Sequence, residues 1–166
     1  MRRRNIGFPK LLECERVLAS LSRMLGIGCE FNRLMSVLGI GVDFVECARI
    51  QRSIDRFGDR FLHRVFTDGE IEYSMSMKYP ARHLAARFAG KEAVAKAFGT
   101  GIGKSMGWRN IDIRKKESGE PFLVFSGPAQ ELAVKRGITS ALITLSHTEH
   151  HAMAAVVLEG ATSQPD

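Results

Sequence analysis

The segment spanning residues 80–98 limits the possible folds of this chain more than any other feature, because it has the pattern of one long, alanine-rich helix. Pro80 suits the first turn of a helix, and Gly99 can end it as a left-handed cap. Apolar side chains recur between them at Leu84, Phe88, Val94 and Phe98. The many alanines suggest close packing, so we expect this helix to be central to the domain.

Shorter elements are predicted on both sides of this helix. Residues 37–45 form an apolar run typical of a strand, and residues 46–57 have helical spacing that Gly58 would end. Thr67 and Glu70 have capping-box spacing, which predicts a helix over 68–77. The remaining segments are predicted as strand 108–114, turn 117–120, strand 121–125, helix 128–136, and strands 141–146 and 152–158. This order predicts an α+β fold, with an antiparallel sheet packed on the long central helix.

The first 34 residues differ in composition from the remainder. Their apolar positions fit a short amphipathic helix followed by a glycine-containing stretch, and Met35 directly precedes the first predicted strand. We therefore divide the chain into an amino-terminal extension (1–34), one domain (35–160) and a tail (161–166). The extension is predicted to be either an appended helix or the product of an upstream translation start.

The charge and hydropathy of the chain narrow the class of protein. A formal net charge of +6 favours an anionic partner, but one Trp, two Tyr and no helix-turn-helix or zinc-finger spacing disfavour nucleic acid. The apolar run 37–45 is far shorter than the roughly 20 residues that span a membrane. The basic start resembles a targeting peptide, but Lys10, Glu13, Glu15 and Arg16 interrupt the apolar region that would have to follow it, so we expect a cytoplasmic protein.

Asp43 and Glu92 are the candidates for a metal site. Asp43 lies inside an apolar strand, where a charged group needs a partner. Two carboxylates suit Mg²⁺, which binds one or two of them together with phosphate and water. Two simpler interpretations stay open: Asp43 could face water or cap the next helix, and Glu92 could pair with Lys96 one turn further on.

A glycine-rich loop follows the central helix at residues 99–104. Its three glycines expose backbone N–H groups, and Lys96 and Lys104 add positive charge, so anion binding is physically reasonable. The loop follows a helix carboxyl end, however, where the helix dipole opposes an anion. It therefore differs from the phosphate site at a helix amino end.

Three histidines lie in the predicted turn over residues 146–151. His147, His150 and His151 lack a cysteine partner and the helical spacing of zinc proteases, which disfavours a zinc site. Ser146 lacks the sequence context of a hydrolase nucleophile. The simplest interpretation is that the histidines are solvated turn residues.

Three sequence blocks, taken together, closely resemble the signature blocks of holo-acyl-carrier-protein synthases, a family of 4'-phosphopantetheinyl transferases. The blocks are Gly39-Ile40-Gly41-Val42-Asp43-Phe44-Val45-Glu46 with Arg49-Ile50, Arg87-Phe88-Ala89-Gly90-Lys91-Glu92-Ala93 running into Lys96-Ala97-Phe98-Gly99-Thr100-Gly101-Ile102-Gly103, and Ser146-His147-Thr148. Their order and separations match over about residues 36–159. Gly90 departs from the alanine that is common in the family, and residues 1–34 have no counterpart in its usual short members.

The resemblance implies the 4'-phosphopantetheinyl transferase-like fold and an activity. The enzyme would transfer the 4'-phosphopantetheine group of coenzyme A to a serine of an apo-acyl carrier protein, with adenosine 3',5'-bisphosphate leaving, in fatty acid biosynthesis. It implies that Asp43 and Glu92 bind Mg²⁺. It also implies that coenzyme A lies along Lys96, Gly99, Thr100, Gly101, Gly103 and His147.

The resemblance further implies two kinds of protein contact. Arg49 would meet acidic side chains of the carrier protein. Arg52 and Arg56 follow it on the same helix face at i+3 and i+7, and from this spacing we expect the three arginines to form the carrier-docking face. A homotrimer is implied, with active sites at subunit interfaces, where Asp43 and Glu92 could come from different chains.

Lys91 is a further catalytic candidate, which could hold a phosphate, assist proton transfer or pair with a neighbouring acid. The base that takes the serine proton is left open among water, Glu92 and Lys91. Two other function classes also stay open. One is another magnesium-dependent phosphoryl or nucleotidyl enzyme, and the other is a non-enzymatic basic binding module.

Overall fold

The structure is a computed structural model that describes residues 35–161, so the predicted extension (1–34) and residues 162–166 of the predicted tail lie outside the described residues. The elements are β1 (Met35–Glu46), α2 (Cys47–Phe57), α3 (Asp59–Val65), α4 (Asp68–Met75), α5 (Pro80–Ala97), the 3-10 turn η1 (Trp108–Asn110), β2 (Ile111–Lys115), β3 (Pro121–Phe125), α6 (Gly127–Lys135), β4 (Ile138–His147) and β5 (His151–Ala161). No helix among the described residues is long and apolar enough to cross a membrane.

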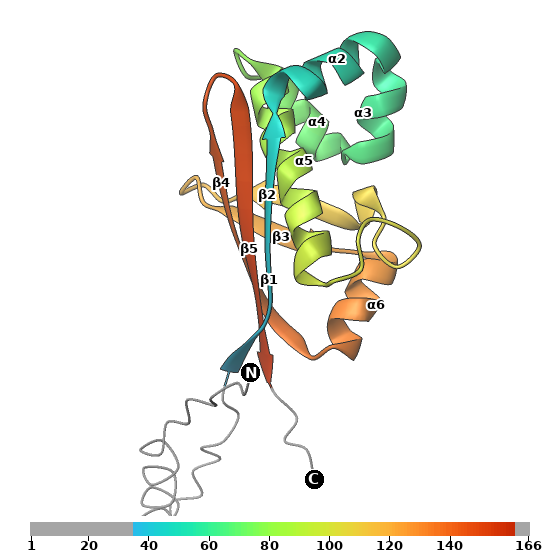
Figure 1. The fold of residues 1–166 in the computed structure, drawn as a ribbon, viewed down its shortest axis with the longest axis vertical. Coiled ribbons are helices and arrows are strands. Elements are labelled where there is room, and N and C mark those ends of the chain that lie inside the picture. Colours follow the sequence, from blue (N-terminus) through green and yellow to red (C-terminus); the bar gives the residue numbers. More distant parts are fainter. Residues whose placement is uncertain (1–34, 162–166) are drawn as a thin grey trace, which may run out of the picture. The chain divides into compact units, whose positions relative to one another are not determined.

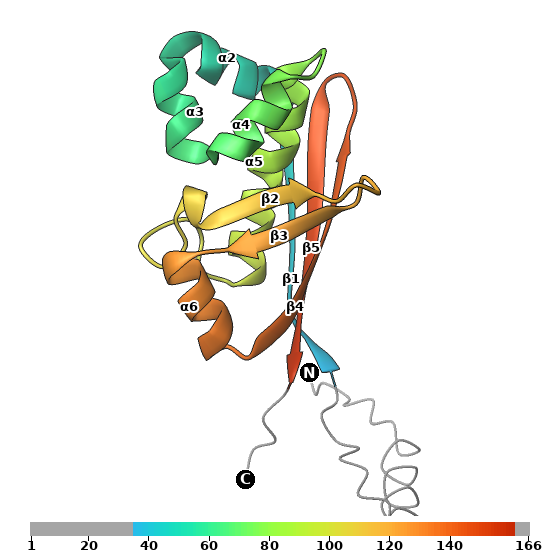
Figure 2. The same cartoon turned by 180° about the vertical axis from the view of Figure 1, so that it is seen from behind.

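Three long strands form an antiparallel sheet in the order β1-β5-β4, and β2 pairs with β3 in a separate hairpin. The helix α5 packs against all three strands of the larger sheet. The helices and the β2–β3 hairpin lie on one side of that sheet (Figures 1 and 2). The α+β prediction, with an antiparallel sheet on a long central helix, is confirmed.

Most predicted elements are present, with ends shifted by a few residues. Thr67 and Glu70 form the capping box before α4, and Gly99 has a φ of 62° after α5. One prediction was wrong in detail, because the predicted strand 108–114 begins as the 3-10 turn η1. The helix α3 was not predicted. The chain turns at Gly58, with a φ of 52°, and becomes helical again at once.

Two glycines of β1 allow this strand to lie directly against the backbone of α5. A Cβ atom at Gly41 would overlap the carbonyl oxygen of Ala93, and one at Gly39 would overlap that of Ala97. Both alanines are buried in this contact. Side chains two residues apart on a strand share a face, so the close contact brings Asp43 next to α5.

A buried ion pair ties α4, α5 and the start of β2 together. Lys91 Nζ lies 2.8 Å from Glu70 Oε2, and neither side chain has exposed surface. The ammonium also donates hydrogen bonds to the carbonyl oxygens of Trp108 and Ile111, at 2.8 and 2.6 Å, so its three protons all have acceptors. Glu70 accepts two further hydrogen bonds from backbone N–H groups. The pair is therefore fully hydrogen-bonded in the interior.

We expect Lys91→Met to lower the free energy of unfolding by about 3–5 kcal/mol, because it leaves the Glu70 carboxylate buried without its cation. The double variant with Glu70→Gln should lose less than this single variant, because no uncompensated charge remains. Urea unfolding followed by circular dichroism measures both. The matched control is Lys116→Met, which removes an ion pair with Glu120 that is more than half exposed and should change stability by about 1 kcal/mol or less. Equal stability of the Lys91 and Lys116 variants would contradict this expectation.

Candidate active site

Asp43 and Glu92 form one acidic group where β1 meets α5. Asp43 Oδ1 accepts a hydrogen bond from Lys96 Nζ at 2.8 Å, and the Asp43 side chain is 15 % exposed. Glu92 lies one helical turn before Lys96 on α5. Burial raises the pKa of Glu92, and the nearby charge of Asp43 raises it further, whereas Lys96 and Arg49 oppose that shift. Both carboxylates therefore belong to one chain at this group, and the implied division of the pair between two chains is not needed.

Two of the simpler interpretations, helix capping by Asp43 and an ion pair between Glu92 and Lys96, are not found among the described residues. Glu46, not Asp43, occupies the N-cap position of α2, and no side chain caps that helix. Lys96 forms its ion pair with Asp43, on another element, and also donates to the carbonyl oxygen of Val42 at 3.1 Å. The structure thus links β1 and α5 through charge at this point.

A divalent cation fits this carboxylate pair. Lys96 offers one positive charge to two carboxylates, and the charge of Asp43 adds to the burial that raises the pKa of Glu92. Residues 35–161 contain no group of three or more His, Cys, Asp or Glu side chains that could hold a metal ion. A cation here would therefore take most of its ligands from water and phosphate, which is the habit of Mg²⁺.

Arg49, near the start of α2, stands beside the carboxylate pair. Its guanidinium lies 5.9 Å from the centre of the Phe88 ring, one turn before Glu92 on α5. The Phe88 ring in turn packs on the Trp108 ring, with centroids 4.8 Å apart. Arg52 and Arg56 are also exposed on α2. The three arginines therefore form a basic surface that begins at the carboxylate pair.

The glycine-rich loop has fewer free donors than the sequence suggests. The N–H of Gly99 donates to Lys96 O at 2.9 Å, and that of Thr100 donates to Ala95 O at 3.1 Å, so both close the end of α5. The N–H of Gly103 donates to the carbonyl oxygen of Met106, just after the loop, at 3.0 Å. Phosphate binding at this loop, which stays a prediction, would rely mainly on the neighbouring lysine side chains.

His147 does not join the carboxylate pair within one chain. Its ring packs on that of His83 in α5, with centroids 5.0 Å apart. His83 and Glu92 are nine residues apart, or two and a half helical turns, so they project from opposite sides of α5. The predicted site residues of one chain therefore form two groups on opposite sides of α5. One group is at the carboxylate pair, and the other contains His147.

Lys91 is also absent from the carboxylate pair. Its ammonium is fully buried and bound to Glu70 and two carbonyl oxygens. This geometry gives Lys91 a structural role and no support for the predicted catalytic role. In the structure Lys91 pairs with an acid, Glu70, which is the third of the roles predicted for it.

A group of residues around His147 was missed by the sequence analysis. We call the following five side chains the basic cluster: Tyr73, His83, Arg87, Lys115 and His147. The Arg87 guanidinium lies 4.3 Å and the Lys115 ammonium 5.7 Å from the centre of the Tyr73 ring, and the rings of Tyr73 and His83 are 6.0 Å apart. These residues come from α4, α5, β2 and β4, so no local sequence pattern unites them. The only sequence signal for this cluster is that His83 and Arg87 are four residues apart on one helix, which places them on the same face.

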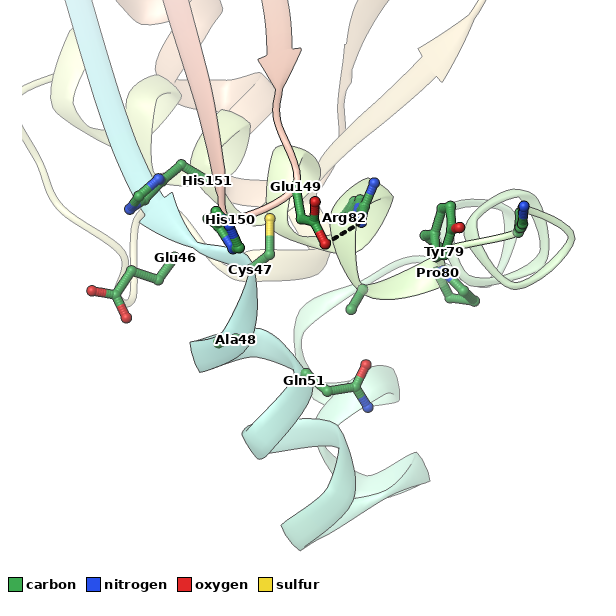
Figure 3. A pocket seen from close by; sticks show the side chains of 12 residues that line it. Glu46, Cys47, Ala48, Gln51, Tyr79, Pro80, Arg82, Glu149, His150 and His151 are labelled. Carbon is green, nitrogen blue, oxygen red and sulfur yellow. Dashed lines mark ion pairs between the residues drawn. The ribbon is translucent and has the colours of Figure 1, made fainter.

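A separate cavity of about 630 Å³ lies between the start of α2, the turn before α5 and the β4–β5 turn (Figure 3). Arg82 Nη2 and Glu149 Oε1 form an ion pair across it at 3.5 Å. His150 and His151 line this cavity, but none of the predicted site residues does. The cavity and the carboxylate pair are therefore different surfaces.

Comparison with known proteins agrees with this arrangement. The family model of the 4'-phosphopantetheinyl transferase superfamily matches residues 39–156. Proteins named holo-(acyl-carrier-protein) synthase from Koribacter versatilis and Chlamydia trachomatis are 45% and 42% identical over 123 residues, which are 74% of this chain and 98% and 100% of theirs.

Solved structures extend the comparison to the fold. The holo-(acyl-carrier-protein) synthase of Neisseria meningitidis matches with a TM-score of 0.70 at 35% identity, over 74% of this chain and 98% of that one. The Helicobacter pylori synthase in complex with coenzyme A matches with a TM-score of 0.65 at 33% identity, over 72% and 98%. The family match covers both residues of the carboxylate pair, Lys96 and His147. This chain belongs to the 4'-phosphopantetheinyl transferase superfamily.

Proposed function

We propose that this protein transfers the 4'-phosphopantetheine group of coenzyme A to a serine of an apo-acyl carrier protein, releasing adenosine 3',5'-bisphosphate. The observation that carries the proposal is the joining of Asp43, Glu92 and Lys96 where β1 meets α5. Relatives that share more than two fifths of their residues with this chain are named for this reaction. A structural neighbour holds coenzyme A.

In the proposed reaction the serine oxygen forms a bond to the β-phosphorus of coenzyme A, and the bond from that phosphorus to the oxygen of the leaving bisphosphate breaks. Mg²⁺ held by Asp43 and Glu92 would supply positive charge against the pyrophosphate. Lys96 holds Asp43 in place, and its half-exposed ammonium adds charge on the same side. Lys91 is out of reach of the serine proton, which leaves Glu92 and water as acceptors. Phosphoryl transfer of this kind depends mainly on positioning and charge.

The basic surface of α2 suits an acidic carrier protein. Arg49, Arg52 and Arg56 are exposed and form no ion pair with a carboxylate of the described residues. Arg49 lies nearest to the carboxylate pair, since its charge acts on the pKa of Glu92. A carrier docked here would present its serine beside that pair. The cytoplasmic location and the role in fatty acid biosynthesis belong to the same proposal.

The proposal includes a homotrimer. Within the described residues, one face of the three-stranded sheet is apolar and exposed, with Ile40 66%, Phe44 60%, Leu142 54% and Met153 42% exposed. A contiguous apolar face of this kind is typical of a protein interface. The carboxylate pair and the basic cluster lie on opposite sides of α5, so a complete site needs the cluster of a second copy beside the pair of the first. The exposed sheet faces of the copies would pack together in this trimer.

We expect the full chain to add the mass of phosphopantetheine to an apo-acyl carrier protein in the presence of coenzyme A and Mg²⁺, as measured by mass spectrometry. Asp43→Asn and Glu92→Gln should each lower the rate by at least about 10–100-fold, which is the range for loss of weaker outer-shell groups at metal sites. The control Glu131→Gln, an exposed carboxylate on α6, should keep the parent rate. No mass increase with the parent protein would reject the proposed function, and full activity of both variants at limiting Mg²⁺ would reject the metal assignment.

We expect Arg49→Glu to raise the KM for the carrier protein while the KM for coenzyme A changes little. The physical reason is that charge complementarity steers encounter, and its effect falls with salt because the Debye length is about 8 Å at physiological ionic strength. Steady-state kinetics with each substrate varied at two salt concentrations measure the effect. Lys135→Glu, an exposed charge reversal on α6, is the matched control. An equal change in both KM values would contradict docking at α2.

We expect light scattering to give about three times the chain mass of 18.4 kDa. Phe44→Glu should reduce that mass, because it places a charge in the apolar sheet face, and should reduce transfer activity with it. Val134→Glu is the control, since Val134 is 67% exposed on α6, away from the sheet face. A monomeric parent protein with full activity would contradict the composite site.

A further inference from the structure

Arg136 links the end of α6 to the end of α5. It is the C-cap residue of α6, and its Nη1 donates a hydrogen bond to the carbonyl oxygen of Phe98, the C-cap residue of α5. In both views α6 lies next to the end of α5 (Figures 1 and 2). A contact between residues 38 positions apart therefore fixes the point where the glycine-rich loop begins.

Phe98 makes this point a firm anchor for the loop. The residue has no exposed surface, and its ring packs edge-on against that of Phe125 in β3, with centroids 5.6 Å apart. The Arg136 guanidinium lies 5.8 Å from the centre of the Phe98 ring. Beyond the loop, Met106 is also fully buried and exchanges two backbone hydrogen bonds with Gly103. The loop is thus held between two buried side chains, and Arg136 acts on the first of them.

The carbonyl groups at the end of α5 are satisfied in two ways. Backbone N–H groups of the turn that follows the helix bond to the carbonyl oxygens of Val94, Ala95 and Lys96, at 2.9–3.1 Å. The carbonyl oxygen of Phe98 instead receives the Arg136 side chain, from another element. A cationic side chain that bonds to the last carbonyl groups of a helix also stabilises the negative end of the helix dipole.

This charge lies where the helix dipole would oppose the proposed substrate. The carboxyl end of a helix carries the equivalent of about half a negative charge, which disfavours an anion at the loop that follows it. Lys96, the basic residue in the last turn of α5, is already paired with Asp43. Arg136 forms no ion pair with a carboxylate among residues 35–161, so its charge is available to offset the dipole.

We infer that Arg136 is a positioning residue for coenzyme A, because its charge offsets the dipole of α5 and its hydrogen bond fixes the start of the glycine-rich loop. This inference rests on the proposed function, which supplies coenzyme A as the ligand. Arg136 acts through Phe98 and the end of the helix, without touching the ligand. The carboxylate pair and the basic surface of α2 do not involve it. Its loss therefore weakens the binding of coenzyme A and leaves carrier docking unchanged.

Three variants separate the charge of Arg136 from its hydrogen bond. Arg136→Lys keeps the charge, Arg136→Gln keeps a donor without the charge, and Arg136→Met removes both. Isothermal titration calorimetry of the full chain with coenzyme A and Mg²⁺ gives the Kd. We expect Arg136→Gln to raise the Kd by about 2–30-fold, the range for one charge at a helix end, and Arg136→Lys to stay closest to the parent. The matched control is Lys135→Met, one residue earlier and exposed on the same helix.

Two further measurements show whether Arg136 does more than support the fold. In Arg136→Gln the KM for the carrier protein should keep its parent value, and the rise in the Kd for coenzyme A should shrink as salt screens the charge. Hydrogen exchange followed by mass spectrometry should be faster at residues 99–106 in Arg136→Met than in the parent or in Lys135→Met. If Arg136→Met does not fold, the glutamine and lysine variants still decide the inference.

An unchanged Kd for coenzyme A in Arg136→Gln would overturn the inference, even if the variant is less stable to urea, because Arg136 would then be a structural cap only. Equal rises in the Kd for coenzyme A and the KM for the carrier protein would also overturn it. The mass-spectrometric transfer assay distinguishes this failure from that of the proposed function. Transfer by a parent protein whose Kd does not depend on Arg136 rejects this inference alone, whereas no transfer rejects the proposed function.

Discussion

The direct contact between the β1 backbone and α5 is the constraint on which the candidate active site depends. Gly39 and Gly41 face Ala93 and Ala97, and a Cβ atom on either glycine would overlap a helix carbonyl. The strand and the helix therefore approach each other more closely than larger side chains would allow. Asp43 on β1 can then form an ion pair with Lys96, whose charge also acts on Glu92 of the same helix. The small residues have a chemical consequence, because they set the distance between two acids from different elements.

Helix α5 then divides the chemistry of the chain into two parts. Its small residues face the sheet, Glu92 and Lys96 project on one side, and His83 and Arg87 project on the other. Lys91, anchored to Glu70 in the interior, fixes the rotation of the helix about its axis. Fixed rotation holds both sides in register with their partners on β1 and β4. The buried ion pair thus serves the site without touching it.

The sequence predicted the parts of this arrangement that depend on local patterns. The central helix, the capping box at Thr67 and the apolar strand around Asp43 all follow from spacing over a few residues. The parts that it did not predict depend on contacts between distant segments. Lys96 pairs with a carboxylate 53 positions away, and the basic cluster draws on four elements. Lys91 was a catalytic candidate with three roles left open, but neighbours on a helix point 100° apart, and this one points into the core.

The structure shows where the positive charge of the chain is located relative to its unpaired acids. A net charge of +6 predicted an anionic partner, but it did not say where the charge would act. In the structure, positive side chains without acidic partners occur on the α2 surface and in the basic cluster, whereas acids without enough cations occur at the carboxylate pair. An acidic protein, a phosphate and a divalent cation would each relieve one of these imbalances. If two copies must meet to bring the phosphate group and the cation together, assembly and substrate binding stabilise one another. Activity would then depend on protein concentration wherever the subunits dissociate.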